Sequence, residues 1–559
     1  MRTYATPRND LFEMPNGMRG RFTIGNPGDF NGVCPKDATV RSYDITAVLA
    51  NDVLANQLGV TIVPAGDAGV MHEGGPLNAD GGTLVYNPRP TEIRQFNLPD
   101  ANGNIQTIGG QQGPLHDPTG MMYVHTSDLD ANGKLRADAP VEPVTLRTAA
   151  GECLEVTVRN KLPELAPDLA GYNTLLQVVN RDRNSPQGMT WFHNNLVRPS
   201  SHVGLQTQLV STDVTRAGGV NVGNNPAVTV APGGQKTYRF YAGDIGFEAV
   251  QGGGNNGNGR GGNGNNAANQ RMNLVATPIE FGGSNMMPAD KIKQGQKGLI
   301  GSLIVEAEGS TWVENDRALD RQVNDPNATR ETRASATVTK PDGSSYRSLA
   351  VMFQKGQNHR FADGSAVPNL AAEGQGVPED SWDAGQMAIN YGSEPLWFRF
   401  GMPADAPFGR ADGAGFGDIP NAHEAYSNSL TGGDPVTPVF TARAGEEARL
   451  RVLMATGAGR GTTFNLHGHT WQRDPYVCPG SSHLGLDGKC APGQLGSQAI
   501  GDNPTGMVLG GQESVSPAAH FEMPVQAGGT FGVTGDYLFR DQASFGNLSG
   551  LWGILRVTE

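Results

Sequence analysis

The chain has 559 residues and a formal charge of -13, from 42 basic and 55 acidic residues, which disfavours binding to nucleic acid or to an anionic membrane surface. It contains no run of about 18 apolar residues, so the sequence predicts no membrane-spanning helix. The 78 glycines and 37 prolines, with only 37% apolar residues, indicate many short strands and turns in a chain long enough for several domains.

The first 308 residues divide into an extension and a first domain. Residues 1–39 show little hydrophobic periodicity, and we expect an irregular extension. Alternating strand patterns begin at residue 40, recur at 144–147 and 153–160, and end at 298–306. We therefore predict a first domain over residues 40–308.

A low-complexity segment interrupts this first domain. Residues 251–270 are nearly all glycine and asparagine, with Arg260 as the only charge. Such a composition buries too little apolar surface to fold by itself, so we predict a flexible loop unless a partner orders it.

The second half repeats the pattern of the first. Residues 550–557 resemble residues 298–306, which indicates two equivalent domain ends. A hairpin pattern at 336–353 opens the second half, and the charged stretch before it lacks apolar residues. We predict a linker over 309–333 and a second domain over 334–559.

The four cysteines form an even set without a Cys-x-x-Cys motif. Cys34, Cys153, Cys478 and Cys490 either form two disulfides or remain free thiols, and the sequence does not assign the pairing. Disulfides would place the chain in an oxidising compartment, that is, outside the cell, in the periplasm or at the cell surface.

Two stretches near the C-terminus carry a family resemblance. Leu466-His467-Gly468-His469 has metal-ligand spacing, since residues two apart on an extended strand point to one face. Together with the layout of residues 535–557, it resembles the C-terminal copper loops of the multicopper oxidase family. The resemblance implies an all-β fold of two cupredoxin-like Greek-key β-sandwich domains with long loop insertions. Residues 113–124 and the 336–353 hairpin resemble the large bacterial oxidases of the manganese-oxidising type.

The resemblance fails at the copper ligands. Family motifs carry histidines and a cysteine where this chain has Thr462, Asn465, Arg540, Asp541, Gln542 and Gly546. Asp541 stands at the position of the thiolate, and only Leu551, at a non-ligating axial position, is as the family has it. A carboxylate cannot supply the sulfur ligation of a type 1 copper site, so we do not expect the four-copper centre.

A reduced metal site is a weaker hypothesis. The resemblance places His193, His467 and His469 on strands that face the interdomain cleft, with His202 near in sequence. These imidazoles, with Asp541 or Glu513, could hold copper or zinc. The alternative is that His467 and His469 are relics whose rings bond to the backbone.

A second candidate metal site is a calcium loop. Asp128, Asp130 and Asn132 alternate ahead of Gly133, as in the first half of an EF-hand loop, but position twelve is Ala139 and not glutamate. The same Asp-x-Asn-Gly pattern also forms an ordinary turn.

Two functions follow from these patterns. The first is a secreted structural, assembly or binding protein on an oxidase scaffold, with itself or another secreted protein as partner. The alternative is an oxidoreductase with a reduced or rearranged metal site that oxidises metal ions or small reductants, so the sequence leaves open whether the chain is an enzyme. A site completed by another chain is a third possibility, whereas no Gly-x-Ser-x-Gly elbow supports hydrolysis.

Overall fold

The computed structural model describes much of the chain and is mainly β-strand. The described residues are 2–5, 19–22, 33–63, 75–90, 96–99, 105–108, 113–169, 177–180, 190–193, 198–249, 272–291, 293–314, 332–357, 359–367, 386–400, 422–431, 433–457, 462–473, 475–477, 499–500, 506–542 and 549–559. The predicted loop at 251–270 lies outside them.

The first sandwich consists of two sheets. Its outer sheet has the order β14 (Ser211–Thr212), β15 (Gln235–Tyr241), β10 (Cys153–Asn160), β3 (Val40–Leu49) and β8 (Met121–His125). Its inner sheet has the order β13 (Gln206–Thr207), β18 (Gly282–Met287), β19 (Gly301–Glu306) and β9 (Val144–Ala149). Both sheets mix parallel and antiparallel pairs, since β3 pairs parallel to β10 and β9 pairs parallel to β19.

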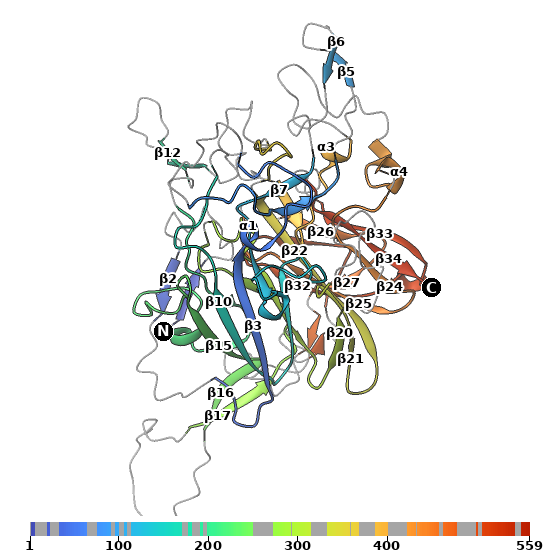
Figure 1. Cartoon of the computed structure of the whole chain (residues 1–559). Coiled ribbons are helices and arrows are strands. Elements are labelled where there is room, and N and C mark those ends of the chain that lie inside the picture. Colours follow the sequence, from blue (N-terminus) through green and yellow to red (C-terminus); the bar gives the residue numbers. More distant parts are fainter. Residues whose placement is uncertain are drawn as a thin grey trace, which may run out of the picture.

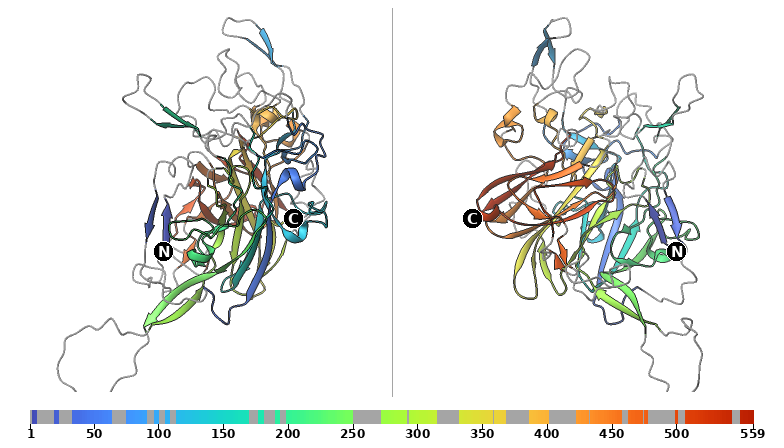
Figure 2. Two further views of the ribbon diagram at one scale, coloured as in Figure 1. Left: turned by 60° about the vertical axis from the view of Figure 1, so that its left-hand side comes forward. Right: turned by 180° about the vertical axis from the view of Figure 1, so that it is seen from behind.

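The second sandwich repeats this plan. Its inner sheet has the order β20 (Thr311–Glu314), β21 (Ser335–Thr339), β22 (Ser345–Gln357), β25 (Glu447–Leu453) and β32 (His520–Gln526), with β23 (Gln386–Ile389) also paired to β22. Its outer sheet has the order β24 (Val439–Arg443), β34 (Trp552–Thr558), β33 (Gly535–Asp541), β26 (Thr462–Leu466) and β31 (Gly511–Val515). The all-β prediction with two sandwiches is therefore confirmed (Figures 1 and 2).

Short elements decorate the sandwiches. The two-stranded pairs are β1 (Arg2–Ala5) with β2 (Arg19–Phe22), β4 (Leu84–Asn87) with β7 (Leu115–Asp117), β5 (Phe96–Pro99) with β6 (Ile105–Ile108), β11 (Gln177–Asn180) with β12 (Thr190–His193), β16 (Gly243–Ala249) with β17 (Met272–Pro278), β27 (Trp471–Gln472) with β30 (Val508–Leu509), and β28 (Tyr476–Val477) with β29 (Ala499–Ile500). The helical segments are α1 (Ala50–Val53), η1 (Thr126–Asp128), α2 (Val214–Ala217), α3 (Leu396–Arg399), η8 (Ala422–Glu424), α4 (Asn428–Thr431) and η9 (Gly529–Phe531). None of the helices in the described residues has the length and apolarity to cross a bilayer.

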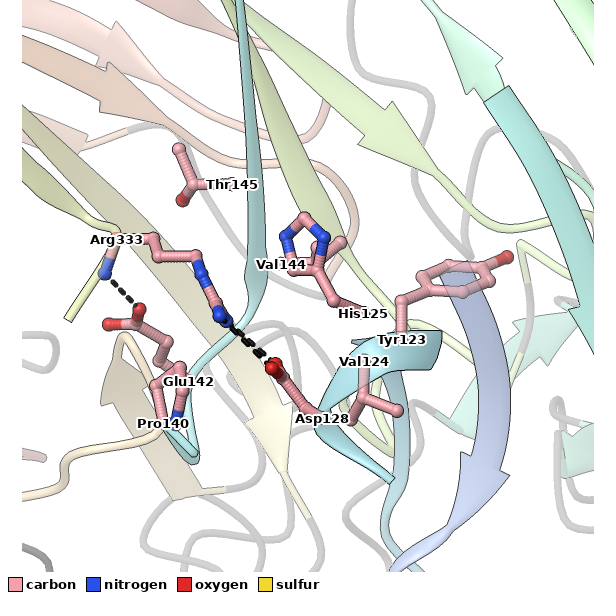
Figure 3. Close-up of a pocket in the computed structure, with 9 residues that line it drawn as sticks. All are labelled: Tyr123, Val124, His125, Asp128, Pro140, Glu142, Val144, Thr145 and Arg333. Atoms are coloured by element: carbon pink, nitrogen blue, oxygen red, sulfur yellow. Dashed lines mark hydrogen bonds and ion pairs between the residues drawn. The ribbon is translucent and has the colours of Figure 1, made fainter. Parts of the chain in front are cut away.

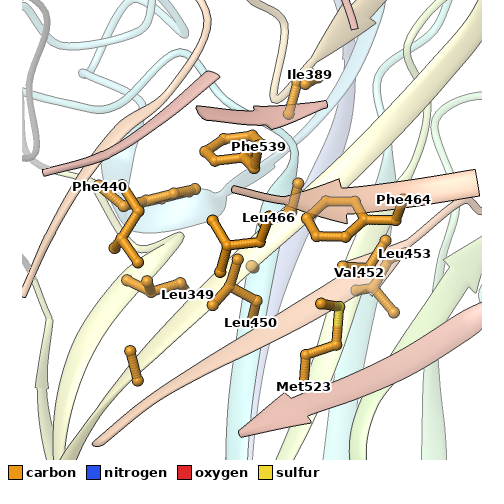
Figure 4. Close-up of a cluster of buried hydrophobic side chains, with 14 of the residues drawn as sticks. Leu349, Ile389, Phe440, Leu450, Val452, Leu453, Phe464, Leu466, Met523 and Phe539 are labelled. Atoms are coloured by element: carbon orange, nitrogen blue, oxygen red, sulfur yellow. The ribbon is translucent and has the colours of Figure 1, made fainter. Parts of the chain in front are cut away.

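Each sandwich encloses its own apolar core. In the second sandwich, Leu450 and Val452 of β25 pack with Phe464 of β26 and Phe539 of β33 from the opposite sheet (Figure 4). In the first sandwich, Leu303 and Val305 of β19 belong to the equivalent cluster. Because strand residues alternate between faces, the neighbours of these residues point out of each sandwich.

The outward faces of the two inner sheets pack against each other. From the first sandwich come Arg147 of β9 and Glu306 of β19, and from the second come Ser348 of β22 and Arg451 of β25. Glu306 accepts hydrogen bonds from Arg147 at 2.9 Å, Ser348 at 2.8 Å and Arg451 at 2.7 Å. The molecule therefore stacks four sheets, with polar contacts at the middle interface.

Two further contacts lie near the predicted domain ends. Cys34, in the predicted N-terminal extension, forms a disulfide with Cys153 at the start of β10. Strand β20 lies inside the range 309–333 and pairs antiparallel with β21. The sheet of the second sandwich thus begins before residue 334, while the exact domain boundaries stay predictions. Cys478 and Cys490 lie outside the described residues.

Candidate functional site

The two motif histidines do not share one strand face. Strand β26 ends at Leu466, and Gly468 has a φ of +72°, a left-handed conformation that suits glycine. The chain therefore turns between the two rings, with His467 exposed and His469 buried. The expectation that both imidazoles project from one extended strand is not what the structure has.

Both ring nitrogens of His469 contact backbone groups of the chain. Its Nδ1 lies 3.0 Å from the carbonyl oxygen of His467, and the N–H of Gly528 donates to its Nε2 at 3.1 Å. Its ring also packs edge-on against Tyr537, and burial lowers the pKa of the imidazole. The Nε2 lone pair that a metal would need is thus engaged by a backbone N–H.

Asp541, at the thiolate position of the family motif, lies beside a lysine. Its Oδ2 is 3.3 Å from Nζ of Lys355, at the end of β22. The side chains of Lys355 and Asp541 are 1% and 0% exposed. An ammonium therefore sits within contact distance of the carboxylate where the family places a metal cation.

The remaining motif positions also serve the fold. Asn465 donates to the carbonyl of Gly510 at 2.7 Å, and Arg540 donates to Gln542 at 2.9 Å. Leu551 is fully buried in the second core, and Gly546 lies outside the described residues. These side chains do not fit a type 1 copper, which needs a thiolate and imidazoles on one ion.

The other residues of the predicted copper or zinc site, where the structure describes them, have contacts of their own. His193 ends strand β12, but its side chain lies outside the described residues. Exposed His202 has Nδ1 3.3 Å from the Thr229 hydroxyl, and Glu513 pairs with Arg473 at 2.9 Å. Within the described residues, no group of three His, Cys, Asp or Glu side chains is placed to hold one metal ion.

In the predicted calcium loop, the two aspartates serve different contacts. Asp130 Oδ1 accepts the backbone N–H groups of Asn132 at 2.8 Å and Lys134 at 2.9 Å, which is the geometry of an Asx turn. Asp128 instead accepts two hydrogen bonds from the Arg333 guanidinium, at 2.7 and 3.1 Å. A calcium site at these residues stays a prediction.

The Asp128–Arg333 pair borders a small pocket (Figure 3). The pocket has a volume of about 10 Å³, room for about one water molecule, and His125 and Glu142 also line it. Burial and the Arg333 guanidinium lower the pKa of His125 to about 4, so the ring is neutral at ordinary pH. Glu142 accepts the backbone N–H of Arg333, and the pocket thus ties the first sandwich to the segment that enters β21.

Sequence reasoning missed a second group of buried histidines. His116 of β7 contacts Thr83 and the carbonyl of Phe361 through its two ring nitrogens, and residue 116 forms a β-bridge with Arg360. His359 is fully buried against Tyr86, with ring centroids 4.1 Å apart, and neither of its ring nitrogens has a hydrogen-bond partner in the part of the chain that the structure describes. Burial lowers the pKa of His116 to about 4 and of His359 to about 3. The sequence signal for His359 was the polar run after residue 353. In the structure this run continues β22 and is buried.

Comparisons with known proteins find only distant structural similarity. No protein-family model and no curated protein matches the sequence. Among solved structures, the chain is similar to a copper nitrite reductase from Nitrosomonas europaea, with 12% identity, 84% of this chain and 92% of that chain covered, and a TM-score of 0.31. A multi-copper oxidase from Pseudomonas thermotolerans has 12% identity over 93% of this chain and 64% of that chain, with a TM-score of 0.37. A laccase from Botrytis aclada has 11% identity over 99% of this chain and 57% of that chain, with a TM-score of 0.35.

The chain thus spans less than two thirds of the length of these last two proteins. The strand pairing described above, and not these similarities, carries the fold assignment.

Proposed function

We propose that this chain is a multicopper-oxidase-like protein without copper redox chemistry, and that it serves as a structural, assembly or binding protein. The observation that carries the proposal is the buried Asp541–Lys355 pair. A second cation about 4 Å from the lysine ammonium would be repelled by about 4 kcal/mol at an effective dielectric constant of about 20. The pair therefore disfavours the binding of a metal cation at Asp541.

The contact between the sandwiches supports a structural role. Glu306 of the first sandwich binds Arg451 of the second through their side chains, and Arg147 also donates to the backbone carbonyl of Ser348. Contacts between protein groups thus hold the two sandwiches against each other, as a structural scaffold needs.

The compartment and the partner belong to the same proposal. The Cys34–Cys153 disulfide favours an oxidising location, so we place the protein outside the cell, in the periplasm or at the cell surface. Its partner is then itself or another secreted protein. Four of the exposed large apolar residues fall between 507 and 533, namely Met507, Val508, Phe531 and Val533.

Metal loading of the purified full chain tests the proposal. The protein is incubated with Cu(II) or Zn(II), desalted and analysed for metal content, for the blue absorption of thiolate-bound copper, and for dioxygen uptake with a phenol or with Mn(II). Mn(II) is included because residues 113–124 and 336–353 resemble the manganese-oxidising type. We expect substoichiometric metal, no blue band and no oxidation, with self-association assessed by light scattering.

Stoichiometric copper together with dioxygen uptake would replace the proposal with the alternative, an oxidoreductase with a rearranged site.

A further inference from the structure

The Lys355–Asp541 pair joins the two sheets of the second sandwich from inside. Lys355 belongs to β22 of the inner sheet, and Asp541 is the last residue of β33 of the outer sheet. Residues two apart on a strand share a face, so Lys355 continues the row of Phe353 and Asp541 continues the row of Phe539. Both phenylalanines belong to the second core. The two charged side chains therefore extend from opposite sheets into the interior of the sandwich.

Aromatic rings border this end of the core. The ring centroid of Phe464 lies 6.0 Å from that of Phe353 and 6.2 Å from that of Phe539, and Figure 4 shows Phe464 and Phe539 in the core. The side chains of Lys355 and Asp541 are only 1% and 0% exposed, so bulk water does not reach their contact. Charges lose their hydration in such surroundings, so a reaction that removes both charges is more favourable here than in water.

The backbone holds the two side chains in place. The N–H of Asp541 donates to the carbonyl of Leu551 at 2.9 Å. On the lysine side, the pairing of β22 with β23 shifts register directly after Lys355, and Gly356 there has a φ of +77°. The lysine stem is closely packed, because a Cβ added to Gly457 would come within 3.3 Å of the Lys355 Cβ. Groups fixed in contact in this way react at a high effective concentration.

The contact thus presents an amine to a carboxyl group in a site that excludes water. Nζ of Lys355 lies 3.3 Å from Oδ2 of Asp541, a non-bonded separation. We propose that Lys355 and Asp541 condense into an intramolecular isopeptide bond, a side-chain amide that ties the inner sheet of the second sandwich to its outer sheet.

The condensation balances without any further reactant. A proton passes from the ammonium to the carboxylate, and the freed lone pair of Nζ attacks Cγ of Asp541. A C–N bond forms and a C–O bond breaks. The oxygen leaves as water with two of the three ammonium protons, and the third stays on the amide nitrogen. No oxidant or reductant takes part, and one positive and one negative charge disappear together.

A buried lysine–carboxylate contact elsewhere in the chain lacks one of these conditions. Lys293 and Lys297 share the carboxylate of Asp168, whose side chain is 13% exposed and therefore open to water. The isopeptide bond goes beyond the proposed function and does not depend on it. The ion pair repels a metal cation at Asp541, and the amide would leave no carboxylate there to bind one.

Mass spectrometry of the full wild-type chain tests the bond. The protein is reduced and denatured first, so that the Cys34–Cys153 disulfide does not contribute. We expect most molecules to be lighter by one water than the sequence requires. After proteolysis, we expect a branched peptide in which the segment with Lys355 is joined to the segment with Asp541.

Variants assign the lost water to this pair. Lys355→Met and Asp541→Leu each remove one partner, and we expect both to have the full mass of their sequences. Lys161→Met, at an exposed lysine, is the matched control and should keep the loss of water. A succinimide at an Asp–Gly step such as Asp342-Gly343 also loses one water, but it would persist in Lys355→Met and would join no peptides.

The decisive measurement does not require the variants to fold, because the branched peptide is sought in the wild type. A wild-type chain of full mass without this peptide would overturn the proposal and leave the pair as an ion pair. A loss of water that persists in Lys355→Met would overturn it as well. Metal loading does not enter the measurement, so failure of the isopeptide bond and failure of the proposed function are recognised separately.

Discussion

Oε2 of Glu306 lies 2.7 Å from Nη2 of Arg451, and the two residues belong to different sandwiches. Both side chains are fully buried, and Glu306 also accepts hydrogen bonds from Arg147 at 2.9 Å and from the Tyr346 hydroxyl at 2.6 Å. Burial alone would raise the pKa of Glu306, but the Arg451 and Arg147 guanidiniums outweigh it and lower the pKa to about 2. Glu306 thus joins guanidiniums from both sandwiches at the middle interface, where Arg451 also pairs with Glu522.

Glu306→Gln should strongly destabilise the protein. The substitution leaves Arg147 and Arg451 buried without their shared carboxylate, and removing one partner of a buried ion pair costs about 3–5 kcal/mol. Urea unfolding of the variant and the wild type measures the loss. Glu155→Gln is the control, because Glu155 pairs with Arg239 at the surface, where such pairs contribute at most about 1 kcal/mol. Equal losses in the two variants would contradict the role given to Glu306.

Acid should destabilise the fold through its buried histidines. The folded pKa values of His116 and His359, about 4 and about 3, lie below the unfolded value near 6.5. Between these values only the unfolded chain binds the protons, so the free energy of unfolding falls as the pH drops from 6.5 towards 3. Each histidine contributes a slope of about 1.4 kcal/mol per pH unit inside its window.

His359→Phe should remove one of these slopes. Phenylalanine keeps the stacking on Tyr86 and brings no unpartnered nitrogen, so we expect a more stable protein whose advantage grows as the pH falls below 6.5. Chemical unfolding at pH 7, 6 and 5 measures it. His202→Phe, at an exposed ring, is the control for the added phenylalanine. An unaltered slope in His359→Phe would show that the ring does not titrate as its burial implies.

The repeat in the sequence located equivalent strands. The pattern shared by residues 298–306 and 550–557 corresponds to β19 and β34, and each pairs parallel to an earlier strand of its own sandwich, β9 and β24. Strand alternation therefore predicted the β class and its duplication well, because each strand has one face on an apolar core.

The middle interface could not be predicted in the same way. Arg449 and Arg451 alternate with Leu450 and Val452 along β25, which in a sequence is typical of a strand with one face in water. The arginines are buried only because another sheet covers that face. The burial of Lys293 and Lys297 against Asp168 could not be predicted either, because closely spaced lysines normally indicate a solvated loop.

The motif histidines show a different limit. Spacing alone placed His467 and His469 on one face, but the strand ends at Leu466 and Gly468 turns the chain. A glycine between two candidate ligands was the signal that the strand period does not apply there.

Loss of the Cys34–Cys153 disulfide should destabilise the first sandwich. The bond joins residues 119 apart in the sequence, and removal of a native disulfide typically costs about 2–5 kcal/mol. We expect the Cys34→Ser/Cys153→Ser double variant to unfold at lower urea concentration than the wild type. A reductant should lower the Tm of the wild type more than that of the double variant. An equal effect of the reductant on both proteins would place its action elsewhere.

The Asp541–Lys355 pair should behave as a unit. Lys355→Met leaves the buried carboxylate without its ammonium, so we expect a loss of about 3–5 kcal/mol in the free energy of unfolding. Adding Asp541→Leu removes the stranded charge, and the double variant should recover most of that loss, because an apolar pair often replaces a buried ion pair without cost.

Metal affinity of the single variant is a second readout, which a purely structural role of the pair would not change. Without the lysine cation, the Asp541 carboxylate should bind Zn(II) or Cu(II) more tightly in Lys355→Met than in the wild type, as equilibrium dialysis measures. The Lys36→Met variant, at an exposed lysine, should bind as the wild type does. Additive losses in the double variant, together with unchanged metal affinity in Lys355→Met, would mean that the ammonium does not take the place of a metal at this position.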